Sequence, residues 1–547
     1  MFHRPLCVLA LLGSLLVAAC GGVSRDSEPP LIRLFDDLGD HQRPISSGSP
    51  EAQRYFDQGL VLAYGFNHEA AGRSFREAAR RDPSCAICWW GVAFALGPNI
   101  NAPMGPDATR EAWSAVGRAR ELAAGASPVE RGLIEAVAKR YAPDPERADR
   151  VALDQAYADA MREVQRRHPD DLDVATLTAE ALMDLSPWSY WLSESEPKPA
   201  TREALALLEG VLARDPDHPG ANHYLIHVVE EYHPDRGVTA AERLADLAPG
   251  AGHLVHMPSH IFWRVGRYED ALEINRRAAE VDEATFAWCG QRGLYAALYY
   301  PHNIHFLYSA ASNEGRGDLA ISSARRLAAK IDDEALLAFP GAEEFMVMPS
   351  FALLRFGRFD AVLGEPAPAP ERRYATGIWH YARGLAHARR GDAAAAAPEL
   401  ATLRSVAAEE SLARLDFSGV PASRTLELAV AHLEGEIAAT RGERAAAVAA
   451  LERAIALQDA MQYTEPPRWW LPVRQALGAV LLTAGRAEAA EAVYREDLRR
   501  VPRNGWSLYG LGQSLAAQGR AAEAAAVETG FHNAWARADI ELSASRL

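Results

Sequence analysis

Apolar residues recur at helical spacing along most of the chain, in blocks separated by short polar turns. From residue 250 onward, each block starts around a glycine and continues with alanines and leucines on one face, which is typical of an amphipathic α-helix. These blocks are VGRYEDALEINRRAAE (265–280), EGRGDLAISSARRLAA (314–329), FGRFDAVL (356–363), RGDAAAAAPEL (390–400), RGERAAAVAALERAIAL (441–457), AGRAEAAEAVYREDL (484–498) and QGRAAEAAAVE (518–528). A second helical stretch precedes each block and carries a small residue where two helices would touch, such as Gly384, Gly435 or Gly478. The pattern predicts an all-α protein made of repeated helix pairs.

These helix pairs resemble the tetratricopeptide repeat, a helix–turn–helix unit of about 34 residues. Many of the helices end at a dipeptide whose second residue is proline, as at Asp82-Pro83, Asp215-Pro216 and Ala248-Pro249. The clearest repeats cover 51–84, 250–283 and 470–535. The resemblance implies an α-solenoid whose pairs stack into a right-handed superhelix, with the first helix of each pair lining a concave groove. We expect this solenoid over 47–547, with longer helices and insertions around 105–200.

The first twenty residues, MFHRPLCVLALLGSLLVAAC, have the anatomy of a signal peptide. A basic start is followed by an apolar run too short to span a bilayer, and then by small residues before Cys20. The ending VAAC resembles a bacterial lipobox, which implies removal of residues 1–19, lipidation of Cys20 and a flexible tether over 20–46. Gly21 after the cysteine resembles outer-membrane sorting, so we expect a lipid-anchored protein of the cell envelope. The alternative is a plain signal peptide with an incidental cysteine.

Composition narrows the classes of partner. The chain has 547 residues, of which 49% are hydrophobic and 24% are charged, as in globular proteins. Its formal net charge is −16 and it has no block rich in Lys and Arg. Because nucleic-acid binding needs a basic face, we exclude nucleic acid as a partner.

Three successive repeats carry histidines in one register. Two of these segments are NHYLIHVVEE (222–231) and HLVHMPSHIFW (253–263). His223 in the first and His256 in the second each lie seven residues after the proline that ends the preceding repeat. His227 and His260 each follow that proline by eleven residues. In YPHNIHFLYS (300–309), two further histidines stand at the distances from the turn glycine that recur in the preceding repeat. These positions resemble the groove-facing positions of tetratricopeptide first helices.

Histidines four residues apart share one helical face, with Cβ atoms about 5–6 Å apart, which suits two ligands of one metal ion. Neighbouring helices lie about 8–10 Å apart, so imidazoles from adjacent repeats can converge. Together these residues predict one or two metal sites, for copper, zinc or iron. The candidate ligands are His223, His227, Glu230, His253, His256, His260, His302 and His305. The alternatives are a histidine-rich groove for a peptide or small molecule without metal, enzyme chemistry, and structural hydrogen bonding.

A proline interrupts the middle histidine helix. Pro258 removes a helical hydrogen bond and predicts a kink. The same Met-Pro-Ser stands before Gly357 in VMPSFALLRFGRFDA (347–361), where Val347 and Phe351 replace His256 and His260. The proline therefore belongs to the scaffold, and the histidines are an addition in one copy.

Other residues also carry chemistry. Cys85 and Cys88 in CAICWWG have three interpretations: a local disulfide, soft metal ligands or a redox pair. Further candidates for a ligand-binding groove, each with a structural alternative such as capping or loop packing, are Asn99, Asn101, Asn303, Arg468 and Trp469.

The whole mature chain resembles a group of large bacterial tetratricopeptide lipoproteins. The resemblance rests on FNHEAAGRSFREAARRDPSCAICWWGVAFALGPNINAPM (66–104), HMPSH, PHNIHF and YREDL…PRNGWSLYGL. It implies the fold and no activity. Three functions follow as expectations: metal binding in the groove, a metal-dependent copper or iron redox enzyme on the same histidines, and a scaffold that binds a protein or peptide without metal.

Overall fold

The computed structural model describes residues 31–144, 149–289, 293–417 and 419–547. Almost all of its regular structure is helical, with two short antiparallel hairpins. The α-helices are α1 (Pro50–Tyr64), α2 (His68–Arg81), α3 (Ala86–Ala95), α4 (Pro106–Leu122), α5 (Pro128–Val137), α6 (Arg150–Arg167), α7 (Leu172–Met183), α8 (Pro199–Arg214), α9 (Pro219–Val229), α10 (Val238–Leu247), α11 (Gly252–His256), α12 (Pro258–Arg264), α13 (Tyr268–Cys289), α14 (Tyr300–Asn313), α15 (Gly317–Ala328), α16 (Asp333–Ala338), α17 (Glu343–Met346), α18 (Met348–Arg355), α19 (Phe359–Gly364), α20 (Arg373–Arg389), α21 (Ala393–Ala407), α22 (Ala422–Thr440), α23 (Arg444–Asp459), α24 (Val473–Thr483), α25 (Ala487–Arg500), α26 (Gly505–Ala517) and α27 (Ala521–Ala534). The strands are β1 (Trp191–Ser193), β2 (Glu196–Pro197), β3 (Asp416–Phe417) and β4 (Val420–Pro421), and the single π-helical turn is η5 (Tyr295–Tyr299).

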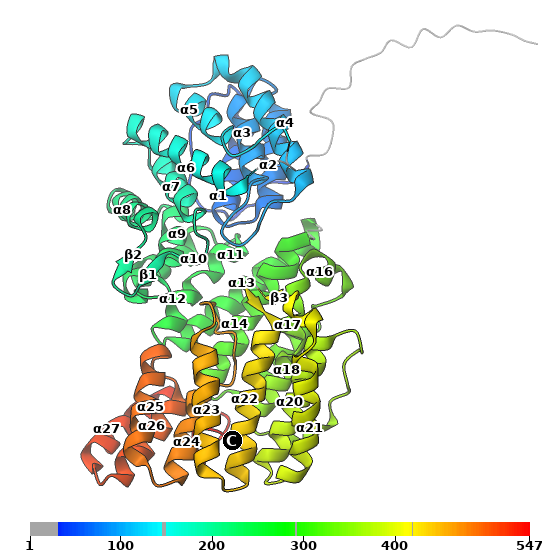
Figure 1. The fold of residues 1–547 in the computed structure, drawn as a ribbon. Helices are drawn as coiled ribbons and strands as arrows, with labels where there is room; N and C mark the ends of the chain where they lie inside the picture. The colour runs from blue at the N-terminus through cyan, green and yellow to red at the C-terminus, as the bar shows by residue number, and fades with distance from the viewer. Residues whose placement is uncertain (1–30, 145–148, 290–292, 418) are drawn as a thin grey trace, which may run out of the picture.

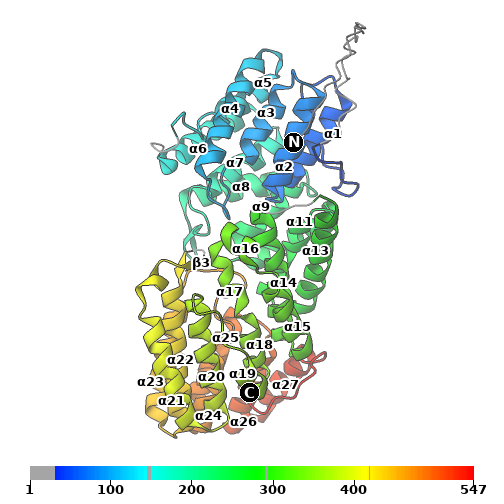
Figure 2. The same ribbon diagram turned by 90° about the vertical axis from the view of Figure 1, so that its right-hand side faces the viewer.

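Consecutive helices pack as pairs, and the pairs stack along the chain, as α1 with α2, α20 with α21 and α22 with α23. Figures 1 and 2 show an N-terminal half and a C-terminal half joined through α9 to α14. The turn glycines Gly266 and Gly315 have φ values of +76° and +74°, a conformation that residues with a Cβ rarely adopt. The protein is therefore an all-α, tetratricopeptide-type solenoid, as the repeat pattern predicts.

The C-terminal repeats return to pack on the middle of the chain. The Arg264 guanidinium donates to the carbonyl of Arg500 at 3.0 Å, and the Tyr268 hydroxyl donates to the carbonyl of Pro502 at 2.7 Å. The Trp506 indole N–H similarly reaches the carbonyl of Ser312 at 2.8 Å. The segment between α23 and α24, residues 460–472, also lies against α12 and α14: Glu465 lies 3.3 Å from the Arg264 guanidinium, and the Trp470 indole N–H donates to His305 at 2.8 Å.

The N-terminal segment splits into two parts. The signal peptide and Cys20 lie outside the described residues. Residues 31–46, which the sequence assigns to the tether, pack on the solenoid instead: Ile32 is buried, and Arg43 forms a two-pronged ion pair with Asp171 at 2.7 and 2.8 Å. Among the described helices, none combines the length and the apolar character needed to cross a bilayer.

The predicted kink is confirmed. α11 ends at His256 and α12 begins at Pro258, with Met257 between them. The second Met-Pro-Ser copy breaks one residue earlier, where Val347 separates α17 from α18 and α18 begins at Met348.

Candidate metal centre

The structure brings six of the seven predicted histidines into two groups of three. All six lie on first helices of three successive pairs: α9, the broken helix α11–α12, and α14. In each group the ligand nitrogens lie within 4.8 Å of one another. The first group is His223, His227 and His253, and the second is His256, His260 and His302.

In the first group, imidazole nitrogens are buried without a partner. Nδ1 of His223 donates to the carbonyl of Tyr64 at 2.5 Å, which leaves a lone pair on Nε2. That Nε2, Nε2 of His227 and both ring nitrogens of His253 have no hydrogen-bond partner and are shielded from solvent. Burial is the main reason that the pKa of each of the three imidazoles is lowered, so the rings are neutral. Unsatisfied buried polar groups each cost about 1–3 kcal/mol, so these nitrogens are available to bind a ligand.

In the second group, the Nε2 atoms of the three imidazoles converge on one point. Nε2 of His256 lies 3.0 Å from Nε2 of His260, which in turn lies 3.5 Å from Nε2 of His302. Nδ1 of His256 donates to Oδ1 of Asn275 at 2.6 Å, since the amide nitrogen of Asn275 is used on the carbonyl of Ala271. Burial also lowers the pKa of His256 well below its usual value.

Glu230 connects the two groups from behind. One carboxylate oxygen accepts from Nδ1 of His260 at 2.6 Å, and the other accepts from Nδ1 of His227 at 3.3 Å. Burial alone would raise the pKa of Glu230, but the two imidazoles outweigh it and lower the pKa to about 2. Because both oxygens contact Nδ1 ring atoms, Glu230 can orient two ligands from behind. Its own ligand atom also lies within 4.8 Å of those of His260 and Glu465, so its role as a metal ligand stays a prediction.

A second carboxyl group reaches the site from the far end of the chain. Oε2 of Glu465 lies 3.7 Å from Nδ1 of His260, and the Tyr463 hydroxyl donates to the other oxygen. Burial and the charge of Glu230 raise the pKa of Glu465 well above its usual value. Two carboxyl groups therefore flank His260.

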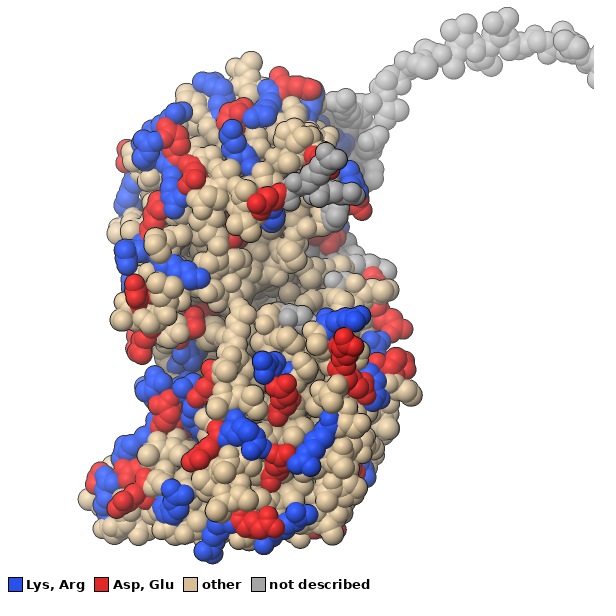
Figure 3. Space-filling view, viewed as in Figure 1, with Lys and Arg blue, Asp and Glu red and all other residues tan. Residues whose placement is uncertain are grey.

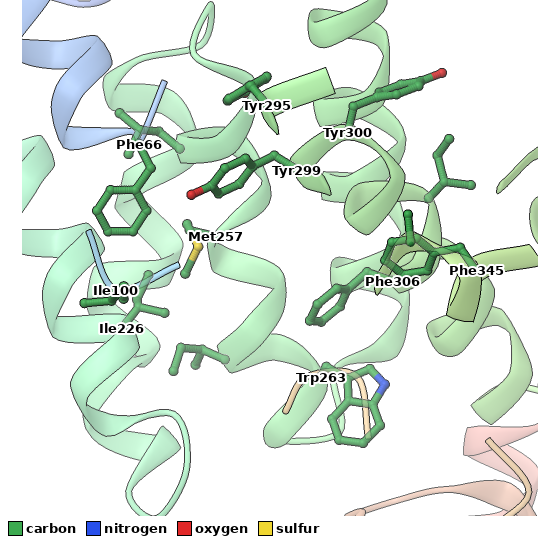
Figure 4. Close-up of a cluster of buried hydrophobic side chains, with 14 of the residues drawn as sticks. Phe66, Ile100, Ile226, Met257, Trp263, Tyr295, Tyr299, Tyr300, Phe306 and Phe345 are labelled. Atoms are coloured by element: carbon green, nitrogen blue, oxygen red, sulfur yellow. The ribbon is translucent and has the colours of Figure 1, made fainter. Parts of the chain in front are cut away.

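The two histidine groups are in contact with each other. The ring centroids of His227 and His260 lie 5.7 Å apart, and those of His253 and His256 lie 5.6 Å apart. Apolar side chains surround them: Met257 and Tyr299 lie near the middle of a buried cluster, with Phe66 on one side and Phe306 and Phe345 on the other (Figure 4). The arrangement is two adjacent three-nitrogen sites in an apolar setting.

Two strained aromatic residues pack on the first group. Phe66 and Trp188 have φ values of +54° and +57°, which are unusual for bulky residues. The Phe66 ring lies 4.7 Å from that of His223, and the Trp188 ring meets that of His227 edge-on at 5.4 Å. Backbone strain of this kind concentrates at functional sites, where the surrounding structure holds it in place.

The histidine groups open into a cavity of about 760 Å³ between the two halves of the molecule. Figure 3 shows the surface hollowed where those halves meet, with few charged side chains there. Five histidines line this cavity: His227, His253, His260, His302 and His305. A metal ion bound by either group would therefore keep a coordination position accessible to a molecule in the cavity.

His305 lines the cavity but belongs to neither group. Its Nε2 accepts a hydrogen bond from the Trp470 indole N–H at 2.8 Å, so the lone pair that would bind metal is occupied. The prediction that His305 is a metal ligand is thus corrected. A further histidine–carboxylate group, His41, Asp173 and His218, is occupied by donors as well, since Asp173 accepts from Tyr64 and Arg43.

Cys85 and Cys88 form a disulfide bond. Of the three interpretations, the structure has the local disulfide, which removes both sulfurs from the metal ligands.

Some of the remaining predicted groove residues line this cavity, and others do not. Asn99 and Asn101 line the cavity, and Asn101 accepts from the Trp188 indole at 2.9 Å. Arg468 also lines it and pairs with Glu344. Asn303 does not line this cavity, because it is buried and donates to Asp282 at 2.8 Å.

Trp469 packs among Phe351, Tyr381 and His432 and lines a second cavity of about 930 Å³. This second cavity lies on the other side of the segment 460–472, which lines both.

Sequence reasoning missed the residues that orient the histidines. Asn275, the Tyr64 carbonyl and Glu465 come from other helices or loops, up to 205 residues from the histidine they approach, and no local spacing marks them. The sequence shows Trp188 and Trp470 only as aromatic residues, and nothing in it indicates that they lie beside the histidines.

The comparisons with known proteins add nothing on function. No protein-family model matches the chain, and no curated protein matches it in sequence. Among solved structures, it is similar to the human IFIT1 dimer with m7Gppp-AAAA, at 12% identity and a TM-score of 0.34, over 88% of this chain and 96% of that chain. It is also similar to the APC/C hetero-tetramer Cut9-Hcn1, at 12% identity and a TM-score of 0.30, over 89% of this chain and 76% of that chain.

Proposed function

We propose that this protein binds two metal ions, one in each group of three histidines on the floor of the cavity. The observation that carries the proposal is the convergence of three imidazoles in each group, where Nε2 of His256 lies 3.0 Å from Nε2 of His260 and the Nδ1 atoms of these two rings contact Asn275 and Glu230.

The spacing fits a metal–imidazole site. Ligand nitrogens about 2.0–2.1 Å from a tetrahedral metal ion lie about 3.3 Å from one another. The distances of 3.0 and 3.5 Å around Nε2 of His260 bracket that value. The buried, unpartnered nitrogens of His223, His227 and His253 support a second ion beside the first.

We further propose that the protein works at the cell envelope on a lipid anchor at Cys20. The signal-peptide pattern of residues 1–19 supports this location. The Cys85–Cys88 disulfide is compatible with it, because disulfides persist in oxidising compartments outside the cytoplasm.

Elemental analysis of the purified full chain, solubilised in mild detergent and carrying no histidine tag, tests the proposal. We expect about two metal ions per chain in the native protein, and neither in a His223→Ala/His256→Ala variant. His380→Gln is the matched control, because His380 contacts Glu399 on a distant repeat and is part of neither group. A native chain that stays without metal after reconstitution with copper, zinc and iron would contradict the proposal.

A second candidate function is the binding of a protein or peptide without metal. The cavity of about 930 Å³ favours it, because arginines and aromatic residues such as Arg474, Arg500 and Trp469 line this space. A partner captured by the native protein would remain bound in the presence of a chelator and to the His256→Ala variant. Loss of the partner under either condition would assign the interaction to the metal centre instead.

A further inference from the structure

We propose that the two ions are copper and that the centre oxidises an aromatic diol, held in the cavity, with dioxygen as the oxidant. This inference rests on the proposed function. It adds the identity of the metal, the class of substrate and the reaction.

The donor set favours copper. Each group offers three imidazoles and no carboxylate. Manganese and magnesium prefer oxygen ligands, and iron in oxygen-activating sites commonly takes a carboxylate beside two histidines, whereas imidazole suits copper and zinc. The ligands therefore reduce the choice to these two metals.

Charge decides between copper and zinc. Few acidic groups contact the ligand rings: among the described residues, Glu230 and Glu465 approach Nδ1 of His260 at 2.6 and 3.7 Å, and Glu230 also contacts His227. Two zinc ions would bring four positive charges into surroundings that include Met257, Phe306 and Tyr299 (Figure 4). Copper(II) brings the same charge as zinc, but its reduced form, copper(I), halves that charge, and a buried apolar site stabilises the lower charge. A copper pair can alternate between its two oxidation states here, and zinc cannot.

The cavity fits a flat aromatic molecule. Its volume of about 760 Å³ lies within the usual range for small-molecule sites. Hydrogen bonds hold two indole rings in place on its wall, from Trp188 to Asn101 at 2.9 Å and from Trp470 to His305 at 2.8 Å. The Tyr299 ring meets that of His253 edge-on at 4.7 Å. Rings fixed in this way form walls on which another aromatic ring can stack.

Two neighbouring hydroxyl groups match two neighbouring metal ions. Because the two histidine groups touch, their ions would lie close together, as in two-metal centres where the ions are about 3.5–4 Å apart. Adjacent oxygens on one ring can each bind one ion. A diol is therefore favoured over a molecule with a single hydroxyl group.

The reaction balances as follows for each turnover. Both O–H bonds of the diol break, its two C–O single bonds become carbonyl bonds, and the ring loses two electrons and two protons. Each copper(II) ion takes one electron and becomes copper(I). Two turnovers supply four electrons and four protons, which reduce one molecule of dioxygen to two of water, so two diols and one dioxygen give two quinones and two waters.

The test uses the full chain loaded with copper and desalted, with 4-methylcatechol as the probe. We expect catechol-dependent oxygen uptake with one dioxygen consumed for two quinones formed, measured with an oxygen electrode and by quinone absorbance. The His223→Ala/His256→Ala variant, taken through the same loading and desalting, controls for adventitious copper and should be at least about 100-fold slower. Zinc-loaded protein should be inactive.

A cavity variant separates the substrate site from the metal site. Trp188→Ala should keep two copper ions per chain and raise the KM for 4-methylcatechol several-fold, because it removes a wall of the cavity and leaves every metal ligand in place. Two bound copper ions without catechol-dependent oxygen uptake would overturn this inference and leave the proposed function intact. A native chain that holds zinc and refuses copper would do the same, whereas a chain that binds no metal would contradict both.

Discussion

Glu230 lies 2.6 Å from Nδ1 of His260 through one carboxylate oxygen, and its other oxygen contacts a histidine of the neighbouring group. A single buried carboxylate thus fixes the orientation of one ligand in each group. An acceptor behind a ligating imidazole sets its tautomer and raises its basicity, so the two proposed ions would share one supporting residue. Binding of the two ions should be coupled through it.

Replacing Glu230 should weaken both sites together. Glu230→Gln keeps the size of the side chain but offers only one acceptor oxygen, so one of the two histidines loses its support. We expect metal affinity to fall by about 10–100-fold, the usual effect of losing such a partner. Competition with a chromogenic chelator measures it.

Glu231→Gln is the matched control, since burial raises the pKa of Glu231 to about 7 and its side chain lies by Tyr232 rather than by the histidines. It should leave metal affinity unchanged. Equal losses in the two variants would show that the effect comes from the loop and not from Glu230.

The break at Pro258 should matter for metal binding, whereas the equivalent break in the other copy should not. Pro258→Ala restores a backbone N–H and lets α11 and α12 join into one regular helix, which moves His256 relative to His260. We expect a several-fold loss of affinity in the second group, measured by titration calorimetry.

Pro349→Ala makes the equivalent change in the first turn of α18, just after the break at Val347, where no histidine follows. It should affect the unfolding temperature without affecting metal affinity. Native affinity in both variants would mean that the kink plays no part in positioning the ligands.

Individual residues show which parts of the fold and of the site can be predicted from the sequence. The alanine pattern and the glycines at turns, such as Gly266, suffice for the solenoid, because helix pairing is a local property that repeats. The shared register of His223, His256 and their neighbours places them on first helices for the same reason. The sequence does not say which imidazoles converge, since that depends on the curvature of the superhelix.

His305 illustrates the limit. It stands in the same register as the ligands, yet its lone pair is taken by Trp470, 165 residues away. Glu230 likewise lies on the predicted face, and its two oxygens contact the Nδ1 atoms of His227, on its own segment, and of His260, on the next repeat. Long-range packing of this kind leaves no mark in local spacing.

The stability of the fold should depend on pH through Asp282. Burial raises the pKa of Asp282 to about 7, even though hydrogen bonds from Tyr295 and Asn303 oppose the shift. The folded state therefore keeps a proton between about pH 4 and pH 7 that the unfolded state has lost. Stability falls as pH rises through this window, by up to about 1.4 kcal/mol per pH unit.

Urea unfolding at pH 5, 6.5 and 8 measures this dependence. Asp282→Asn has no group to titrate at this position, so its stability should change less with pH than that of the native protein. An identical pH slope in both proteins would contradict the assignment of the raised pKa to Asp282.

Breaking the disulfide should leave the metal centre intact. Cys85→Ser/Cys88→Ser removes the Cys85–Cys88 bond at the start of α3, and neither sulfur belongs to the histidine groups. We expect native metal content with a lower unfolding temperature. Loss of metal in this variant, at a temperature where circular dichroism shows it folded, would return the cysteines to the list of ligands.

The most direct measurement is the anomalous diffraction of copper-loaded crystals, recorded on both sides of the copper absorption edge. The account predicts two peaks close together on the floor of the cavity, one among His223, His227 and His253, and one among His256, His260 and His302. Strong data without a peak at these six imidazoles, or with copper bound only elsewhere, would contradict it.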